Sequence, residues 1–225
     1  MALKPFEKWN FEEIDNTFGY QRIYDIFAPL NNWATAAKNV KIDSFILQEA
    51  EKLRNKLSKE ADMYNEDELK MQFIAPLLHH IDYDNFSKWR LFSQRKISAE
   101  VQLANGTTDI LGGRVEAMVA RGKVNPSTPY FFIHEYKPLN KTTPSDPLGQ
   151  LVAAMIVAQY TNKDDATIYG LYVRGAVWIF VVLDGKQYTE TKMYDATNPD
   201  DLYFILQMLT WVKIDLTRRA TEQNA

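Results

Sequence analysis

The chain has 225 residues, of which 46% are hydrophobic and 13% aromatic, so it can bury a large core and is not a disordered chain. It contains no cysteine, which excludes disulfides, thiolate nucleophiles and cysteine-ligated metal centres. Its net charge of −3 argues against indiscriminate binding to nucleic acid.

Two features of the sequence bear on the location of the protein. The longest apolar runs, Leu151–Ala158 and Ala176–Leu183, are too short to cross a bilayer. The first residues have no apolar stretch of the kind that a secretory signal peptide carries. We therefore expect a cytoplasmic protein that does not contact a membrane.

The first sixty residues have a helical pattern from about Phe6 to Glu60. Asp43-Ser44 is a favourable start for a helix, because Asp caps the free backbone N–H groups of a first turn. Acidic and basic residues balance here, and no group of side chains points to chemistry. We expect residues 1–60 to form a helical extension and residues 61–225 to form the core of the protein.

The remaining chain alternates between helical and extended patterns. A helix is predicted over about 65–81, followed by strands over 89–103 and 108–120 with an Asn105-Gly106 turn between them. The later predicted elements are a strand over 130–137, a helix from Asp146-Pro147 to about Tyr160, strands over 167–173 and 176–183, and a helix from Asn198-Pro199. This order predicts an α/β fold with a mixed central sheet flanked by helices.

Glu135 and Lys137 are the first candidate site residues. Side chains alternate along a strand, so both point to the face that Ile133 also occupies. The strand begins with the apolar run Tyr130–Ile133, which is typical of a central strand, and the charged pair stands at its carboxyl end, where α/β sheets tend to place sites. A structural ion pair is the alternative interpretation.

Asp109 is the second candidate acid. About 25 residues separate it from Glu135, which is enough for a strand, a loop and a return along a neighbouring strand. We therefore expect the two carboxylates to lie side by side. Two carboxylates ~4 Å apart repel by about 4 kcal/mol at an effective dielectric near 20, so a cation is needed to hold them together. Mg²⁺ suits this position, because it takes carboxylate oxygens and water and leaves room for phosphate.

Glu66 and Gln150 are further polar candidates on helices. Glu66 lies at the edge of the apolar stripe that contains Phe73 and Leu77, where a carboxylate is costly unless it is paired or bound to metal. The alternative is that Glu66 simply occupies a first helical turn, where acids are favoured. Gln150 can donate to a phosphate or a metal-bound water, or it can be an ordinary polar residue. His134 points to the opposite strand face from Glu135.

Basic residues are concentrated in the middle of the chain. Between Lys88 and Lys141 they outnumber acidic residues by five, although the whole chain carries a net charge of −3. A basic surface around an acidic site suits phosphodiester chemistry. An excess on solvated strands and loops, without function, explains the same count.

The four elements in this order resemble the PD-(D/E)XK nuclease superfamily. In the resemblance, Glu66 matches the helix glutamate, Asp109 the first strand acid, Glu135-Tyr136-Lys137 the (D/E)-x-K motif, and Gln150 the trailing glutamine. The resemblance covers about residues 65–183 and implies a restriction-endonuclease-like sheet. Thr108, Ala154 and Arg174 stand where the family often has proline, tyrosine and asparagine. These departures concern substrate contacts more than metal ligands.

Two longer segments carry a closer likeness. Asn65–Glu68 followed by Phe73–Leu78 resembles the start of the nuclease domain of type I restriction subunits and of their stand-alone relatives. Pro129–Lys137 followed by Asp146–Leu151 is similar to small, uncharacterised bacterial proteins, and this likeness extends over most of the chain.

The resemblance implies a nuclease that depends on Mg²⁺ or Mn²⁺ and hydrolyses phosphodiester bonds, with DNA as the expected substrate. Asp109, Glu135 and Glu66 would bind the metal, and Lys137 and Gln150 would complete the catalytic set. Members of the superfamily often dimerise to cut two strands, so a homodimer is one expectation. The alternatives are a catalytically silent nuclease fold that binds nucleic acid or a partner protein, and an unrelated protein in which the Glu135–Lys137 pair is structural.

Overall fold

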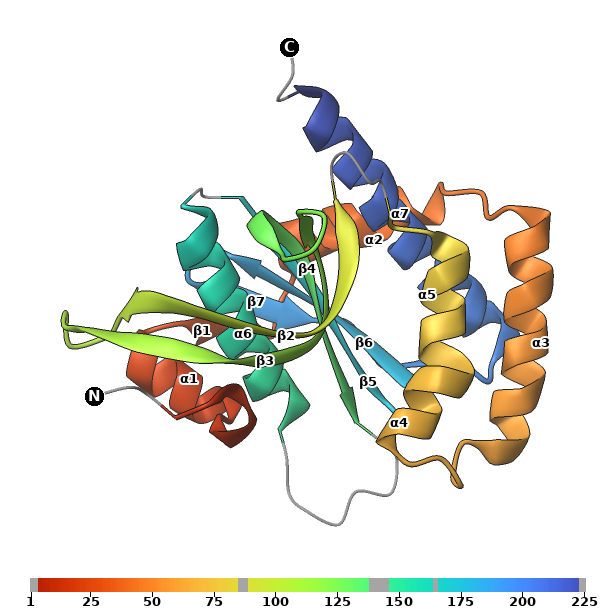
Figure 1. The fold of residues 1–225 in the computed structure, drawn as a ribbon, viewed down its shortest axis with the longest axis horizontal. Coiled ribbons are helices and arrows are strands. Elements are labelled where there is room, and N and C mark those ends of the chain that lie inside the picture. Colours follow the sequence, from red (N-terminus) through yellow and green to blue (C-terminus); the bar gives the residue numbers. More distant parts are fainter. Residues whose placement is uncertain (1–3, 85–88, 138–145, 164–165, 223–225) are drawn as a thin grey trace.

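The fold was obtained as a computed structural model, which describes residues 4–84, 89–137, 146–163 and 166–222. Within these ranges, eight strands form one mixed sheet in the order β1-β7-β6-β5-β4-β3-β2, with β8 also paired to β6 (Figure 1). The strands are β1 (Gln21–Arg22), β2 (Arg90–Gln102), β3 (Thr108–Arg121), β4 (Ser127–Lys137), β5 (Ile168–Arg174), β6 (Val177–Asp184), β7 (Gln187–Glu190) and β8 (Tyr194–Asp195).

Helices cover both faces of this sheet. They are α1 (Phe11–Phe18), α2 (Ala28–Lys38), α3 (Ser44–Glu60), α4 (Glu66–Leu69), α5 (Ala75–Ile81), α6 (Pro147–Asn162) and α7 (Pro199–Glu222), with a 3₁₀ turn at Phe6–Lys8 and a π-helical turn at Lys70–Ile74. The predicted α/β class with a mixed, helix-flanked sheet is therefore confirmed. The pattern missed the strands β1, β7 and β8, which have only two to four residues each.

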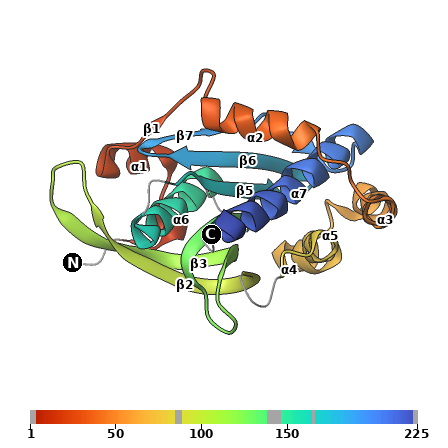
Figure 2. The ribbon, with the colours of Figure 1, turned by 90° about the horizontal axis from the view of Figure 1, so that it is seen from above.

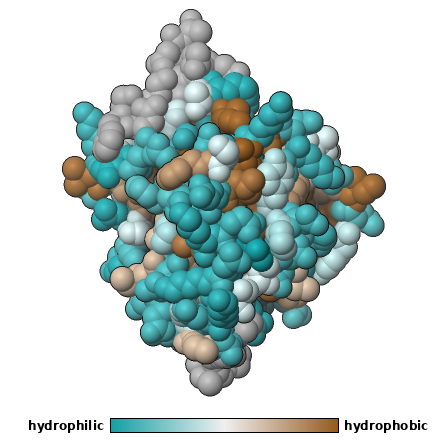
Figure 3. Space-filling model, turned by 90° about the vertical axis from the view of Figure 1, so that its right-hand side faces the viewer, coloured by the Kyte–Doolittle hydropathy of each residue, from teal (hydrophilic) through white to brown (hydrophobic). Residues whose placement is uncertain are grey.

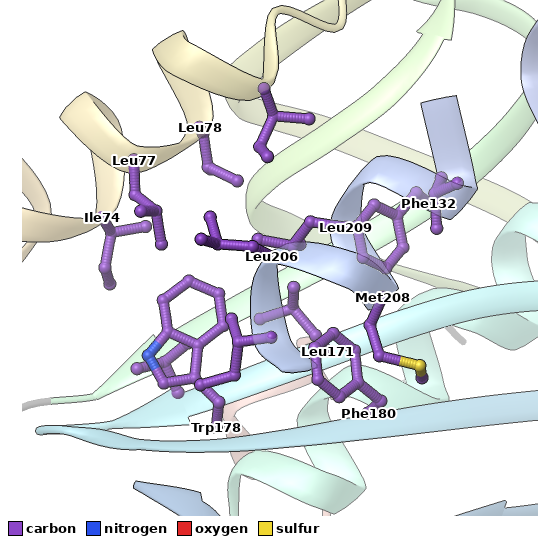
Figure 4. Close-up of a cluster of buried hydrophobic side chains, with 14 of the residues drawn as sticks. Ile74, Leu77, Leu78, Phe132, Leu171, Trp178, Phe180, Leu206, Met208 and Leu209 are labelled. Carbon is purple, nitrogen blue, oxygen red and sulfur yellow. The ribbon is translucent and has the colours of Figure 1, made fainter. Parts of the chain in front are cut away.

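Two hydrophobic clusters lie on opposite faces of the sheet. Figures 1 and 2 show α1 and α6 on one side, and α2, α3, α5 and α7 on the other. Figure 4 shows the second cluster, in which Leu77 and Leu78 of α5 meet Leu206 and Leu209 of α7 above the strand residue Trp178. Since β4 lies between β3 and β5 under these helices, the prediction of a buried central strand is confirmed.

The first twenty-odd residues belong to the same core as the sheet. Phe6, Trp9, Ile14 and Phe18 are at most 5% exposed and pack in the cluster that α6 also joins. Strand β1 then adds to the edge of the sheet by pairing in parallel with β7. The region 1–60 thus contributes three helices and also a strand of the central sheet.

Helix α6 is buried without interruption from Leu148 to Ala158. Asp146 occupies its N-cap position, as predicted, but the Asp146 carboxylate accepts a hydrogen bond of 2.7 Å from the backbone N–H of Phe11. Gly149 lies so close to α1 that a Cβ there would be 2.5 Å from the backbone of Asn10. These contacts fix the start of α6, and therefore Gln150, against the N-terminal segment.

Strands β2 and β3 form a long hairpin that extends beyond the rest of the sheet, on the left in Figure 1. Its turn is the predicted Asn105-Gly106 turn, in which Gly106 has a φ of 86° that favours glycine. Asp109 pairs with Val101 close to this turn.

The face on the right of Figure 1 is largely hydrophilic. Figure 3 shows that hydrophobic residues reach this face as separate small patches rather than as one broad surface. Among the helices of the described residues, none combines the length and the apolar character that crossing a membrane requires.

Candidate active site

Glu66 opens the helical segment that borders the site. Asn65 caps this segment through a reciprocal pair of hydrogen bonds with Glu68. The carboxylate of Glu68 is therefore used to cap the helix. The side chain of Glu66 is 31% exposed and contacts Lys70, one helical turn later. Of these two acids, Glu66 is therefore the one that contacts Lys70, and Glu68 is the one that caps the helix.

Lys70 connects the helix to the sheet. Its ammonium nitrogen lies 2.8 Å from Oε1 of Glu66 and 2.5 Å from Oε2 of Glu116, a residue of β3. Burial lowers the pKa of Lys70, but its hydrogen bonds to Glu116 and Glu66 outweigh burial, so the pKa is raised above its ordinary value. One ammonium therefore holds two carboxylates together.

Glu116, and not Asp109, is the β3 acid beside Glu135. The antiparallel register pairs Ala117 with His134 and Met118 with Ile133, so its next step places Glu116 opposite Glu135. Asp109 lies seven residues earlier on the same strand, which corresponds to about 23 Å at ~3.3 Å per residue. The expectation that Asp109 and Glu135 lie side by side is wrong, because strand pairing sets which residues meet.

The Glu135–Lys137 pair stands at the carboxyl end of β4, as predicted from strand alternation. Both side chains are 9% exposed, and the Lys137 ammonium donates a hydrogen bond to the Glu135 carboxylate. Burial raises the pKa of Glu135 to about 7, Lys137 opposes this shift, and Glu116 and Glu66 add to it. Three carboxylates therefore share one electrostatic environment near this end of the sheet.

Gln94 is a second residue that contacts the carboxylate of Glu116. It lies on β2, and its side-chain amide donates a hydrogen bond of 2.5 Å to Oε2 of Glu116. The backbone of Gln94 has a φ of 54°, a conformation that residues other than glycine seldom adopt. Residues with such strained backbone conformations tend to occur at active sites and ligand-binding sites.

Gln150 and His134 lie on opposite faces of the sheet. Gln150 is 3% exposed in the first turns of α6, on the face where Glu135 and Lys137 also point. His134 is 1% exposed among aromatic residues, and its Nδ1 lies 2.6 Å from the hydroxyl of Tyr136. Burial lowers the pKa of His134 to about 3, so this histidine is neutral and belongs to the core.

A cavity of about 820 Å³ adjoins the acidic residues. Lys70, Gln94 and Glu116 form one part of its wall, and the rest is largely apolar, with Ile74 and Leu78 among its residues. Ligand sites are commonly concave and apolar with a few polar groups, so the cavity offers space for a ligand beside the carboxylates.

The oxygen-rich set suits Mg²⁺ in its chemistry. Within the part of the chain that the structure describes, no three His, Cys, Asp or Glu side chains form a ready group for a metal ion. Lys70 and Lys137 instead lie among the carboxylates of Glu66, Glu116 and Glu135. Mg²⁺ commonly uses only one or two protein carboxylates, with water and substrate phosphate completing its shell, so Glu116 and Glu135 fit this need.

No protein-family model and no curated protein sequence matches the chain. The geometry of Glu66, Glu116, Glu135 and Lys137 therefore stands as the main support for a function.

The buried carboxyl of Glu135 predicts a pH dependence of stability in metal-free buffer. Its pKa rises from 4.5 to about 7 on folding, so between these values the unfolded chain releases a proton that the folded protein retains. The free energy of unfolding should fall as pH rises from about 4.5 through about 7, by about 3 kcal/mol, and level off above that range.

Urea unfolding of the wild type and of Glu135→Gln at several pH values between 4.5 and 8 measures this contribution. The variant should show a flatter profile, whereas Glu7→Gln, at an exposed position, should follow the wild type. Equal pH profiles for wild type and Glu135→Gln would contradict the prediction.

Proposed function

We propose that the protein is a nuclease that depends on Mg²⁺ or Mn²⁺, has a restriction-endonuclease-like core and hydrolyses phosphodiester bonds, with DNA as its substrate. The observation that carries the proposal is the pairing of Glu116 with Glu135 across β3 and β4, with Lys137 beside Glu135 and Glu66 tied to Glu116 through Lys70. The resemblance of Glu135-Tyr136-Lys137 to the PD-(D/E)XK motif adds support, with Glu116 in the place first given to Asp109.

Each residue has a role in this proposal. Glu116 and Glu135 would hold the ion, with Glu66 as a further carboxylate close to them. The bound ion supplies a water of lowered pKa and neutralises charge on the phosphate. Lys137 would orient the attacking water and stabilise the charge that develops on the phosphate. Gln150 donates to a phosphate oxygen or to the attacking water.

The hairpin offers basic residues for the nucleic-acid backbone. Arg95 and Lys96 lie on β2, and Arg114 and Arg121 lie on β3, the strand that also carries Glu116. Phosphate contacts by such side chains provide affinity without sequence preference. Lys88 and Lys141, which bound the basic region of the sequence, lie outside the described residues.

A second candidate function is a catalytically silent module of the same fold that binds nucleic acid or a partner protein. The observation in its favour is that Lys70 and Lys137 already neutralise the carboxylates of the site. A module of this kind would retain the ion pairs for stability and would need no metal.

Cleavage assays separate the two functions. Plasmid, linear and single-stranded DNA and RNA are incubated with Mg²⁺ or Mn²⁺ and with the wild type, Lys137→Met or Lys59→Met, the last an exposed lysine on α3. We expect metal-dependent cleavage that falls by at least about 100-fold in Lys137→Met and is unchanged in Lys59→Met. The nuclease proposal fails if the wild type cleaves none of these substrates with either metal.

A further inference from the structure

Lys70 occupies a central position among the acidic residues. Its ammonium contacts Glu66 and Glu116 and lies 3.7 Å from Oδ1 of Asp67, and its side chain is 18% exposed. Because Glu116 faces Glu135 across the strands, the oxygens that bind Lys70 include one of the two carboxylates proposed to hold the metal.

An ammonium between two carboxylates reduces their mutual repulsion, as a metal ion in the same place would. It offsets a repulsion that amounts to about 4 kcal/mol for two carboxylates ~4 Å apart at an effective dielectric near 20. A divalent ion supplies twice the charge but needs the same oxygens at much shorter distances, near 2.0–2.1 Å for Mg²⁺. Lys70 and the ion therefore compete for Glu116.

Local backbone features hold Lys70 and its partner in these positions. Lys70 is the first residue of the π-helical turn Lys70–Ile74, and π turns inside helices occur frequently at functional sites. Gln94, with its left-handed backbone, fixes the same Glu116 oxygen that Lys70 contacts. Unusual backbone geometry thus occurs at Lys70 itself and at Gln94, the residue that contacts its partner Glu116.

The cavity gives Lys70 a place to move. Lys70 lines the 820 Å³ cavity together with Gln94 and Glu116, so open space lies beside its flexible side chain. Asp67, which is exposed and also lines the cavity, can accept the displaced ammonium.

We propose that Lys70 is a built-in counter-cation that bridges Glu66 and Glu116 in the metal-free protein and is expelled into the adjoining cavity when a divalent ion binds. This inference rests on the proposed function, because it takes the carboxylates as metal ligands. Lys70 is a positioning residue: it keeps the acidic side chains together before the ion arrives and lowers the affinity for that ion.

Calorimetric titration with Mn²⁺ tests the competition. Lys70→Met removes the ammonium and retains the apolar stem, so it should bind Mn²⁺ at least about 10-fold more tightly than the wild type. Lys70→Arg keeps a cation and should stay close to the wild type, and Lys59→Met controls for the loss of a positive charge elsewhere. Equal or weaker Mn²⁺ binding by Lys70→Met overturns the proposal.

Labelling of the wild type tests the movement without a variant that could fail to fold. Acetic anhydride is applied with and without Mn²⁺, and modification of Lys70 and Lys59 is read by mass spectrometry. Acetylation of Lys70 should rise several-fold with Mn²⁺, while that of Lys59 stays constant. Unchanged acetylation of Lys70 at saturating Mn²⁺ overturns the proposal.

The two proposals fail in different ways. Cleavage by the wild type together with equal Mn²⁺ affinity in Lys70→Met retains the nuclease and removes the role of Lys70. Tighter Mn²⁺ binding in Lys70→Met without cleavage of any substrate by the wild type retains the role of Lys70 and removes the nuclease.

Discussion

Glu116→Gln should reduce metal-dependent cleavage by at least about 100-fold, whereas Asp109→Asn should stay within about threefold of the wild type. Glu116 pairs across the sheet with Glu135, and Asp109 is about 23 Å further along β3 at ~3.3 Å per residue. Both changes replace a carboxylate by an amide of nearly the same shape, so they differ chiefly in position. The comparison therefore measures what a carboxylate on β3 contributes to cleavage when it lies beside Glu135 of β4, compared with one near the hairpin turn.

Single-turnover cleavage rates at saturating Mn²⁺ provide the measurement, with circular dichroism to verify that both variants fold. Glu100→Gln, at an exposed position of β2, serves as a third amide substitution in the hairpin. A large loss in Asp109→Asn together with a small loss in Glu116→Gln would move the site to the end of the hairpin and refute the register argument.

Trp33→Ala should destabilise the protein by about 3–5 kcal/mol, the usual cost of removing a large aromatic side chain from a core. Trp33 lies on α2 and is 1% exposed. Its ring packs edge-on against Tyr169 and Phe180, with ring centroids 4.9 and 5.3 Å apart, and its indole N–H donates to the carbonyl of Met208. Removal therefore opens a cavity between α2, the sheet and α7.

Urea denaturation followed by circular dichroism measures this effect. Phe45→Ala provides the control, because Phe45 is also aromatic and N-terminal but is 60% exposed on α3. A loss below about 1 kcal/mol in Trp33→Ala would show that α2 is peripheral and that residues 1–60 are a separable extension. A loss in the expected range makes α2 part of the core.

The sequence pattern predicted the long elements and the faces of their side chains. Helices α3, α6 and α7 begin where Asp43, Asp146 and Asn198 indicated. Asp43 and Asn198 accept hydrogen bonds from the first turns of their helices, which is a local interaction, whereas the Asp146 carboxylate accepts from Phe11 instead. Strand alternation also separated Glu135 from His134 correctly. The strands β1, β7 and β8 escaped prediction, since two to four residues cannot show a period.

The partner of Glu135 could not be predicted from spacing. If the pairing of Arg121 with Ser127 continued unchanged along β3 and β4, Glu135 would face Gly113, which lies between Asp109 and Glu116. Register shifts between Val119 and Arg121 move the pairing by three residues and select Glu116. Bulges of this kind depend on packing around the whole hairpin, and residue spacing carries little information about them.

The contacts of Lys70 also differ in whether they could be predicted: one is local in the sequence and the other is distant. Its pairing with Glu66 follows from the i, i+4 spacing on a helix and was open to prediction. Its contact with Glu116 joins a helix to a strand 46 positions later, which no helical periodicity indicates. In the sequence, Glu116 stands out as a charged residue within the apolar run Val115–Ala120.

The pairing of β1 with β7 has a consequence for folding during synthesis on the ribosome. Ile23, just after β1, accepts a hydrogen bond from Thr189, a residue 166 positions later. At ~5–20 residues per second, synthesis takes on the order of 10 to 30 seconds to deliver that partner. Until α6 (Pro147–Asn162) has been synthesised, Phe6, Trp9 and Phe18 have no α6 to cover them, so this segment should be a preferred binding site for chaperones that recognise apolar segments.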